Sequence, residues 1–420
     1  MYTNAQEKKQ LSLDEAVQLG IQNSKSLKID AAKIEEATAD LLEAKNRQLP
    51  ELKVSGSYMY LPIKPTIDLK IPGVSTAGSP EVHQVAFGSA NLSVPIYNGG
   101  RIKYGIESAK YLVEASKLST ENDKVAIAYN IAQAYNNLFK ANQSIKVLEE
   151  NLTASQKRDE TFLKLENNGV IARNDRLKAN LQTSNIELQL LEAKNNYNIA
   201  NINMDLLIGI PETTEIEVDQ NYIDESDDVK PVDFYLNEAR ENRKDLQALD
   251  QQRKAAVLGT KSAKAENLPS IAFTGGYVAA DIPKFLTIYN AVNVGVGVSY
   301  NLSNLWKENS ALKQSKAKEM QLSATNELLN DNIKLDINRE YQNTDYSKKR
   351  ILVFEKSAEQ ANENFRITKN KYDNGLATMT ELLDADAAQI SANVGIINAK
   401  ADAALAYRKL LQTTGTLTIK

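Results

Sequence analysis

Apolar residues recur at coiled-coil spacing over long stretches of the chain. Downstream of Gly169 they follow steps of four, three, four, three and four residues, and the same steps recur near the C-terminus. This spacing puts them on one face of a helix and predicts two coiled-coil seams. The seams are Ile186, Leu190, Ala193, Tyr197, Ala200 and Met204, and then Ala392, Ile396, Ala399, Ala403, Ala406 and Leu410.

The helix expected before Gly169 carries two apolar seams side by side. A helix with two seams can contact a neighbour on each side, which favours a wall of helices over a two-helix zipper. The first seam is Ile127, Ile131, Ala134 and Leu138, and the second is Ala128, Ala132, Tyr135 and Phe139.

Four other segments alternate apolar and polar residues with a period of two, which predicts two-faced strands. We expect them near 51–60, 85–97, 270–280 and 291–302. The apolar faces are Leu52, Val54, Tyr58 and Tyr60; Ala86, Ala90, Leu92, Val94 and Ile96; Ile271, Phe273, Tyr277 and Ala279; and Val292, Val294, Val296, Val298, Tyr300 and Leu302.

An internal repeat organises these elements. Asn98 and Asn304, Gly169 and Gly375, and Gly209 and Gly415 keep one spacing, since 304 − 98, 375 − 169 and 415 − 209 all equal 206. We therefore expect a first structural repeat over 1–210, an acidic and solvated linker over 211–231 with a short strand-like piece at 215–218, and a second repeat over 232–420.

Each repeat predicts one long antiparallel helical hairpin. The 71 residues from each Asn to the next Gly would form a helix roughly 100 Å long, and the 40 residues of the return roughly 60 Å. Hairpins of this size suit a spacer or the wall of a tube. The turns of the hairpins are expected at Asn168-Gly169-Val170 and Asn374-Gly375-Leu376, where glycine permits the positive φ of a helix end.

Composition excludes several classes of function. The net charge is −4, with no long basic run of the kind that binds nucleic acid. Cysteine is absent, which removes disulfides and thiolate chemistry. His83 is the single histidine, so histidine metal clusters and histidine-based triads are excluded. We expect no catalytic residue, cofactor or metal site, and no enzymatic activity.

Any membrane crossing must be made by the strands, because no apolar window reaches the ~18 residues that a spanning helix needs. Each strand is about as long as a tilted membrane strand, although the alternation alone fits a half-buried soluble sheet as well. Four strands cannot close a barrel, so a membrane role requires oligomerisation, and three copies would supply twelve strands. Residues 1–10 lack an apolar signal core, and we expect an export signal to have been removed.

Taken in order and at repeat spacing, several short motifs make the chain similar to the TolC-like outer-membrane efflux family over essentially its whole length. They are Leu13-Asp14-Glu15-Ala16 with Asn23, Leu49-Pro50-Glu51-Leu52, Leu92-Ser93-Val94-Pro95-Ile96-Tyr97-Asn98-Gly99-Gly100, Leu268-Pro269-Ser270-Ile271, Tyr372-Asp373-Asn374-Gly375-Leu376 and Leu382-Leu383-Asp384-Ala385.

The resemblance implies a homotrimer in the outer membrane of a Gram-negative bacterium, with a 12-stranded barrel above a long periplasmic helical tube. It implies a passive exit duct of a tripartite efflux pump or a type I secretion system. The partners would be a periplasmic adaptor and an inner-membrane pump. The two Asn-Gly turns would then be the docking points for the adaptor.

The resemblance also implies a gate beside those turns. Tyr372 matches the family's gate tyrosine and Asn174 and Asp175 match its polar partners, but Ala377 stands where the family has an arginine. Arg173 could supply a replacement charge toward Glu381 or Asp384. Those two carboxylates lie three residues apart, so three chains would present a ring of six charges at the tip.

Two other classes of function remain open from the residues themselves. A soluble coiled-coil scaffold or adaptor of the cell envelope would account for the helices but not for four strands with apolar faces. For an envelope enzyme, the sequence offers no recognisable set of catalytic residues. Dependence on detergent would separate the duct from the scaffold.

Overall fold

The computed structural model describes residues 8–63, 65, 82–223, 229–283 and 285–417. The chain divides into two compact units, Met1–Ala32, Leu118–Gln247 and Glu327–Lys420 in the first, and Lys33–Lys117 and Ala248–Asn326 in the second. The elements in chain order are β1 (Lys8–Leu11), α1 (Leu13–Asn23), α2 (Lys25–Asn46), β2 (Glu51–Tyr60), β3 (Gln84–Tyr97), α3 (Arg101–Asn167), α4 (Arg173–Ile208), β4 (Glu215–Val218), the 3₁₀ turn η1 (Gln220–Ile223), α5 (Val232–Asn242), α6 (Lys244–Ala265), β5 (Ser270–Ile282), β6 (Leu286–Ser299), the 3₁₀ turn η2 (Leu302–Leu305), α7 (Ser310–Asp373) and α8 (Met379–Thr414).

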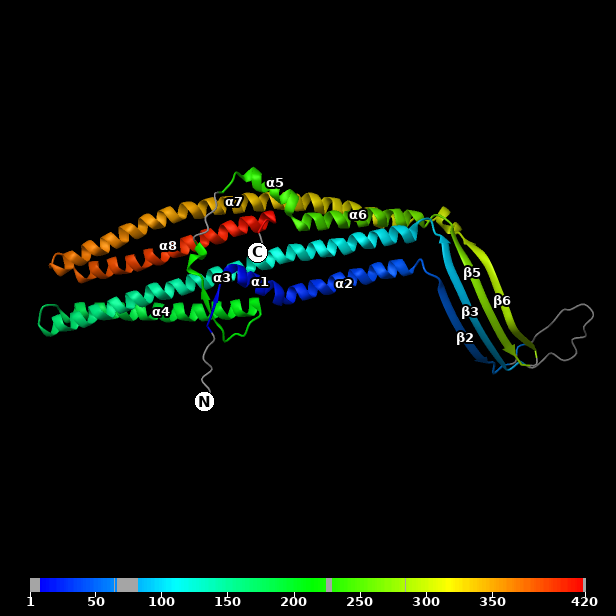
Figure 1. The fold of residues 1–420 in the computed structure, drawn as a ribbon, viewed down its shortest axis with the longest axis horizontal. Coiled ribbons are helices and arrows are strands. Elements are labelled where there is room, and N and C mark those ends of the chain that lie inside the picture. Colours follow the sequence, from blue (N-terminus) through cyan, green and yellow to red (C-terminus); the bar gives the residue numbers. More distant parts are fainter. Residues whose placement is uncertain (1–7, 64, 66–81, 224–228, 284, 418–420) are drawn as a thin grey trace, which may run out of the picture. The chain divides into compact units, whose positions relative to one another are not determined.

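Two helical hairpins form most of the first unit. Figure 1 shows α4 returning beside α3 and α8 returning beside α7. The coiled-coil seams predicted from sequence face inward, because Ile186 and Met204 on α4 and Ala399 and Leu410 on α8 are buried. Both seams predicted on α3 are buried too, which confirms that this helix contacts neighbours on two sides.

The largest apolar cluster of the first unit lies around α3 and joins both hairpins to a small sheet. Tyr135 at its centre is fully buried, and its hydroxyl donates to the Leu11 carbonyl at 2.8 Å and accepts from the Asp219 amide at 2.7 Å. The hydrogen bonds to its one hydroxyl tie β1 and the segment after β4 to the helix, so the polar group carries little cost of burial.

The prediction of a solvated linker over 211–231 is wrong for residues 215–218. Residues 215–218 do form β4, as the pattern predicted, but Ile216 and Val218 are buried and β4 pairs in parallel with β1. The sequence pattern did not predict β1. Alternate apolar residues of β4 enter the core while its glutamates face outward, which is the period-two rule applied to a very short strand.

The second unit contains an antiparallel sheet with strand order β2-β3-β5-β6. Cross-strand partners put the predicted apolar positions on one face, for example Leu52 opposite Leu92, and Phe273 opposite Val296. The other face is polar, with Ser55 opposite Ser89 and their hydroxyl oxygens 2.9 Å apart. The strand expected near 291–302 begins earlier and ends at Ser299, because the Asn301 side chain accepts from the Ser303 amide and starts η2.

Among the residues that the structure describes, none covers the apolar face of the sheet or pairs with the outer edges of β2 and β6. Val294 of β6 is 75% exposed and Val54 of β2 is 78% exposed, although their side chains belong to the apolar face. The edge strands also present unpaired backbone groups on one side. An apolar, unpaired surface of this kind requires a further partner or a non-aqueous environment.

Candidate gating and docking site at the helical tips

Each hairpin ends in the same glycine turn. Gly169 and Gly375 have φ of +72° and +73°. The Val170 amide donates to the Leu165 carbonyl and the Leu376 amide to the Lys371 carbonyl, both at 2.8 Å. Hydrogen bonds of this pattern define the glycine-terminated end of a helix.

The tip turns are open to solvent and carry apolar side chains. A Cβ added at either turn glycine would meet no atom within 4 Å, so the positive φ alone favours glycine there. Val170 is 66% exposed and Leu376 is 77% exposed. Each hairpin therefore ends in an aliphatic side chain that this chain leaves open to solvent.

An apolar cluster joins the two hairpins directly behind the turns. Phe162 of α3, Ala179 of α4, and Met379 and Leu382 of α8 are buried together. Tyr372 of α7 packs against this cluster, with its ring centroid 5.8 Å from that of Phe162 in an edge-on arrangement. The two tips therefore share one small core.

The predicted gate tyrosine lies half-buried at this cluster. Burial raises the pKa of Tyr372, and the carboxylates of Asp175 and Asp373 raise it further, so the hydroxyl stays protonated and able to donate. Asp175 therefore lies close enough to Tyr372 to act on it electrostatically, whereas Asn174 is exposed on the first turn of α4. Of the gate set, Asp175 is the residue whose charge acts on Tyr372.

Glu381 has a local role that its spacing from Asp384 does not reveal. Its carboxylate accepts from the Thr378 amide at 2.6 Å and from the Thr378 hydroxyl at 2.8 Å, and the Glu381 amide donates back to that hydroxyl at 3.3 Å. This capping box starts α8, and its backbone hydrogen bond, then its hydroxyl hydrogen bond, lower the pKa of Glu381. Asp384 is exposed one turn further along.

Arg173 makes no ion pair with Glu381 or Asp384 among the residues that the structure describes. Its side chain is exposed at the first position of α4. Arg176, one turn along, instead forms an ion pair with Glu166 of α3 across the same hairpin turn. Ala377 is half-buried just before α8.

A buried ion pair between the hairpins was not predicted from sequence. Arg158 of α3 donates through Nη1 to Oδ1 of Asp386 at 3.2 Å and through Nη2 to Oδ2 at 2.7 Å. The two side chains are 16% and 5% exposed. The Arg158 guanidinium also lies 5.9 Å from the ring centroid of Phe365 on α7, so one side chain of the first hairpin contacts both helices of the second.

The signal that could have found this pair is the position of Asp386. Met379, Leu382 and Ile390 follow the seam of α8 and are all buried, and Asp386 takes the seam position between Leu382 and Ile390. A carboxylate in an apolar seam requires a cationic partner.

A second charged cluster links three helices farther from the tips. Asp402 of α8 lies 2.8 Å from Nζ of Lys140 on α3 and 3.2 Å from Nη1 of Arg350 on α7. All three side chains are about one-third exposed or less. The contact between α3 and α8 thus has an ion pair near the tip and another well above it.

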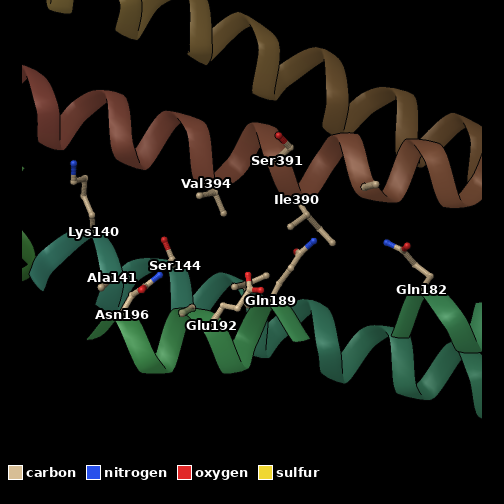
Figure 2. A pocket seen from close by; sticks show the side chains of 13 residues that line it. Lys140, Ala141, Ser144, Gln182, Gln189, Glu192, Asn196, Ile390, Ser391 and Val394 are labelled. Atoms are coloured by element: carbon tan, nitrogen blue, oxygen red, sulfur yellow. The ribbon is translucent and has the colours of Figure 1, made fainter. Parts of the chain in front are cut away.

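A groove between the first hairpin and α8 lies between these two ion pairs. It has a cavity volume of about 540 Å³, and Figure 2 shows Ile390 and Val394 pointing into it from α8. Polar side chains form its rim, among them Gln182, Gln189 and Glu192 of α4.

Within the described residues, no group of three or more histidine, cysteine or carboxylate side chains is placed to hold a metal ion. None of the helices in the described parts of the chain has a stretch long and apolar enough to span a membrane.

The chain matches a known protein family. The family model described as outer membrane efflux protein matches residues 16–210 and 235–416. No curated protein sequence matches the chain.

Three solved channels have a similar fold. The Vibrio cholerae outer membrane protein VceC shares 18% identity at a TM-score of 0.79, covering 96% of both chains. The Campylobacter jejuni CmeC outer membrane channel shares 19% at 0.78, covering 96% of this chain and 86% of its own. The open state of the Neisseria gonorrhoeae MtrE outer membrane channel shares 18% at 0.76, covering 96% and 89%.

Proposed function

The chain belongs to the outer membrane efflux protein family, and we propose that three copies of it form a passive exit duct through the outer membrane. The duct carries substrates outward from an inner-membrane pump and its periplasmic adaptor. The protein itself performs no chemistry. Substrates move through the pore that the three chains enclose.

The observation that carries the proposal is an apolar seam on α4 that this chain leaves uncovered. Leu181, Leu188 and Leu191 are 62%, 56% and 60% exposed, although they follow coiled-coil spacing. The full seam is Leu177, Leu181, Leu188, Leu191, Ile199, Ile202 and Leu206.

The corresponding positions of α8 are partly covered by the first hairpin. Ile397, the counterpart of Leu191, packs against the cluster around Tyr135, and Arg408, the counterpart of Ile202, is buried. Since α4 is the counterpart of α8 in the repeat, its open seam calls for a second hairpin from another copy. Each copy then covers the next, which is a head-to-tail arrangement that closes into a ring.

Two features support treating the hairpins as a tandem repeat. The bounds of α4 and α8 differ by the 206 residues found in the sequence, since 379 − 173 and 414 − 208 both equal 206. Lys194 pairs with Glu149 in the first hairpin, and Lys400 pairs with Glu355 in the second, which is the same ion pair shifted by 206.

The sheet supports the membrane part of the proposal. Its strands of 10 to 14 residues span roughly 33 to 46 Å, enough to cross a bilayer core when tilted. Three copies joined edge to edge would close a 12-stranded barrel, with the apolar face toward lipid and the serine-rich face toward the pore. Closure also satisfies the open edges of β2 and β6.

The tips supply the proposed docking and gating residues. Val170 and Leu376 are the exposed contacts that an adaptor would cover, with Asn168, Gly169, Asn374 and Gly375 shaping the turns. Tyr372 and Asp175 form the proposed closing contact of the gate. Glu381, Asp384 and Arg173 are the exposed charged residues that would set the charge of the tip.

The molar mass of the protein in detergent, measured by light scattering, tests the seam. We expect a trimer for the parent chain, and monomers for Leu188→Glu, because the seam would then bury an unpaired carboxylate at a cost of several kcal/mol per ion. The matched control is Gln189→Glu, which adds the same charge at the neighbouring exposed position, on the side of α4 that lines the groove within the chain. A stable monomer of the parent chain in the absence of detergent would favour the soluble scaffold instead.

A further inference from the structure

The serine-rich face of the sheet is polar only over the half where β2 begins. Ser55 lies opposite Ser89 on this face, and the Asn91 amide donates to the Ser89 hydroxyl at 3.2 Å. The Asn293 side chain lies on the same face, because a Cβ added at Gly276, its partner on β5, would meet Oδ1 of Asn293 at 2.8 Å. Hydroxyl and amide groups therefore line this half of the face.

The same face becomes apolar toward the other end of the sheet. Val85 and Phe87 precede Ser89 on β3 by even steps, so they share its face. Met59 pairs with Val85, and Ala280 pairs with Phe87. Since β2 follows α2 and β3 leads into α3, these residues lie at the end of the sheet away from those helices (Figure 1). We call this region the exit zone, and its apolar members include Met59, Val85, Phe87, Val278, Ala280, Ile288 and Ala291.

The exit zone is open and uncharged in this chain. The side chains of Met59 and Phe87 are exposed. Among the paired strand residues that the structure describes in this zone, Ser57 has the one polar side chain and none is charged. A lumen that is wet along its whole length would keep polar residues at these positions, so the zone departs from the alternation that such a barrel predicts.

The role of this zone rests on the proposed function, in which the serine-rich face lines the pore of a 12-stranded barrel. The barrel would then bring the Phe87 and Met59 side chains of all three copies into the lumen near its outer mouth. Such a barrel is narrower than the 16- to 18-stranded barrels that leave a wide aqueous channel. The apolar side chains would therefore project into the path of a substrate.

We propose that the exit zones of three copies form an apolar ring that binds molecules with an apolar body as they leave the duct, while hydrated inorganic ions pass unbound. The phenyl ring of Phe87 offers apolar area to alkyl and aromatic groups, and its face attracts organic cations. The flexible thioether of Met59 adapts to molecules of different shape. The hydroxyl and amide groups deeper in the lumen hold water instead and supply no such preference.

Block of single-channel current in planar lipid bilayers tests the ring. Tetrabutylammonium and tetramethylammonium carry the same charge and differ in apolar surface, so we expect only tetrabutylammonium to block parent trimers at a given concentration. Phe87→Ser combined with Met59→Ser should weaken this block by about tenfold or more, since losing contact with roughly two methylene groups gives that factor. The matched control is Asn293→Ser, which changes the lumen outside the exit zone and should leave the block unchanged.

Tryptophan fluorescence tests which way the exit zone faces, without relying on conductance. Trp306 is the single tryptophan of the chain, so Trp306→Phe gives a background without indole. In that background, Phe87→Trp in lipid vesicles should be quenched by acrylamide in the water and not by brominated lipid. The matched control is Val54→Trp, on the apolar face of β2, which should show the reverse.

The possible outcomes separate the ring from the duct itself. Parent pores that tetrabutylammonium does not block, or block that persists in Phe87→Ser with Met59→Ser, overturn the ring while the duct stands. Quenching of Phe87→Trp by brominated lipid, or loss of trimers in the double serine variant, shows that these side chains contact lipid or protein and also overturns the ring. Parent trimers that form no pores contradict the duct, and the ring with it.

Discussion

Replacing Asp386 with leucine should loosen the hairpin tips. The substitution leaves the Arg158 guanidinium facing an apolar side chain, 16% exposed and without its carboxylate. Removing one partner of a buried ion pair costs about 3 to 5 kcal/mol. Because Arg158 retains some solvent and contacts the ring of Phe365, we expect a cost just below that range, about 2 to 3 kcal/mol.

Hydrogen exchange, measured by mass spectrometry on the detergent-solubilised trimer, reports this loss of stability at the hairpin tips. A cost of about 2 to 3 kcal/mol should raise the exchange rate of amides in the first turns of α8 by roughly 30- to 150-fold, since each 1.4 kcal/mol is a factor of ten. Amides around the buried Tyr135 should be unchanged, because that cluster lies far from the tip along α3.

The double variant Arg158→Met with Asp386→Leu supplies the matched control. It replaces both charges with apolar side chains, which is often neutral or stabilising when the volume is kept. Exchange at the tip should therefore return close to the parent value. Parent-like exchange in Asp386→Leu, or exchange in the double variant as fast as in the single one, would refute the reasoning.

Further changes test other parts of the account. Burial raises the pKa of Asp205 to about 6. This group therefore stabilises the folded state below its unfolded pKa near 4 and loses that contribution as the pH rises through 6. Asp205→Asn should make the stability of the helical unit, measured by thermal melting, less dependent on pH between 4 and 7. Glu381→Gln with Asp384→Asn should reduce cation preference, read from reversal potentials, while keeping the capping box because glutamine can replace glutamate there; unchanged potentials would exclude a charged ring. Gly375→Val should abolish export while trimers persist, since a branched residue at positive φ costs about 1 to 2 kcal/mol at an exposed turn, and loss of trimers instead would show a purely structural glycine. Tyr372→Phe should raise resting conductance if its hydroxyl closes the gate, and a parent-like conductance would leave closure to the packing of the ring.

Local periodicity was sufficient to predict the two long helical hairpins, the four long strands and the faces of each. The α4 and α8 seams repeat every three or four residues, so burial of Ile186 and Leu410 follows from spacing alone. The tip glycines follow from turn chemistry, since an Asn-Gly pair after a long helix predicts a positive φ. Strand alternation placed Val54 and Val294 on the apolar face of the sheet.

Contacts between distant segments could not be predicted in the same way. β1 and β4 pair over four residues each, so neither strand has enough alternation to predict the pairing. Arg158 and Asp386 are 228 residues apart, and a charged residue on a helix is usually solvated. Only the position of Asp386 within an apolar seam signalled its partner.

The capping role of Glu381 was missed for a different reason. Thr378 followed three residues later by Glu381 matches the capping-box pattern, so the local role was readable. Spacing from Asp384 favoured a pore charge instead, and the cap does not exclude that second role, because the carboxylate remains exposed. Local hydrogen-bonding patterns therefore need to be tested before a charge is assigned to a pore.

Conductance of the purified protein in planar lipid bilayers tests the central claim most directly. The account predicts discrete conductance steps from detergent-purified trimers, and their disappearance with Leu188→Glu but not with Gln189→Glu. A folded, helical parent protein that inserts no conducting pores under the same conditions would contradict a passive duct built from three copies of this chain.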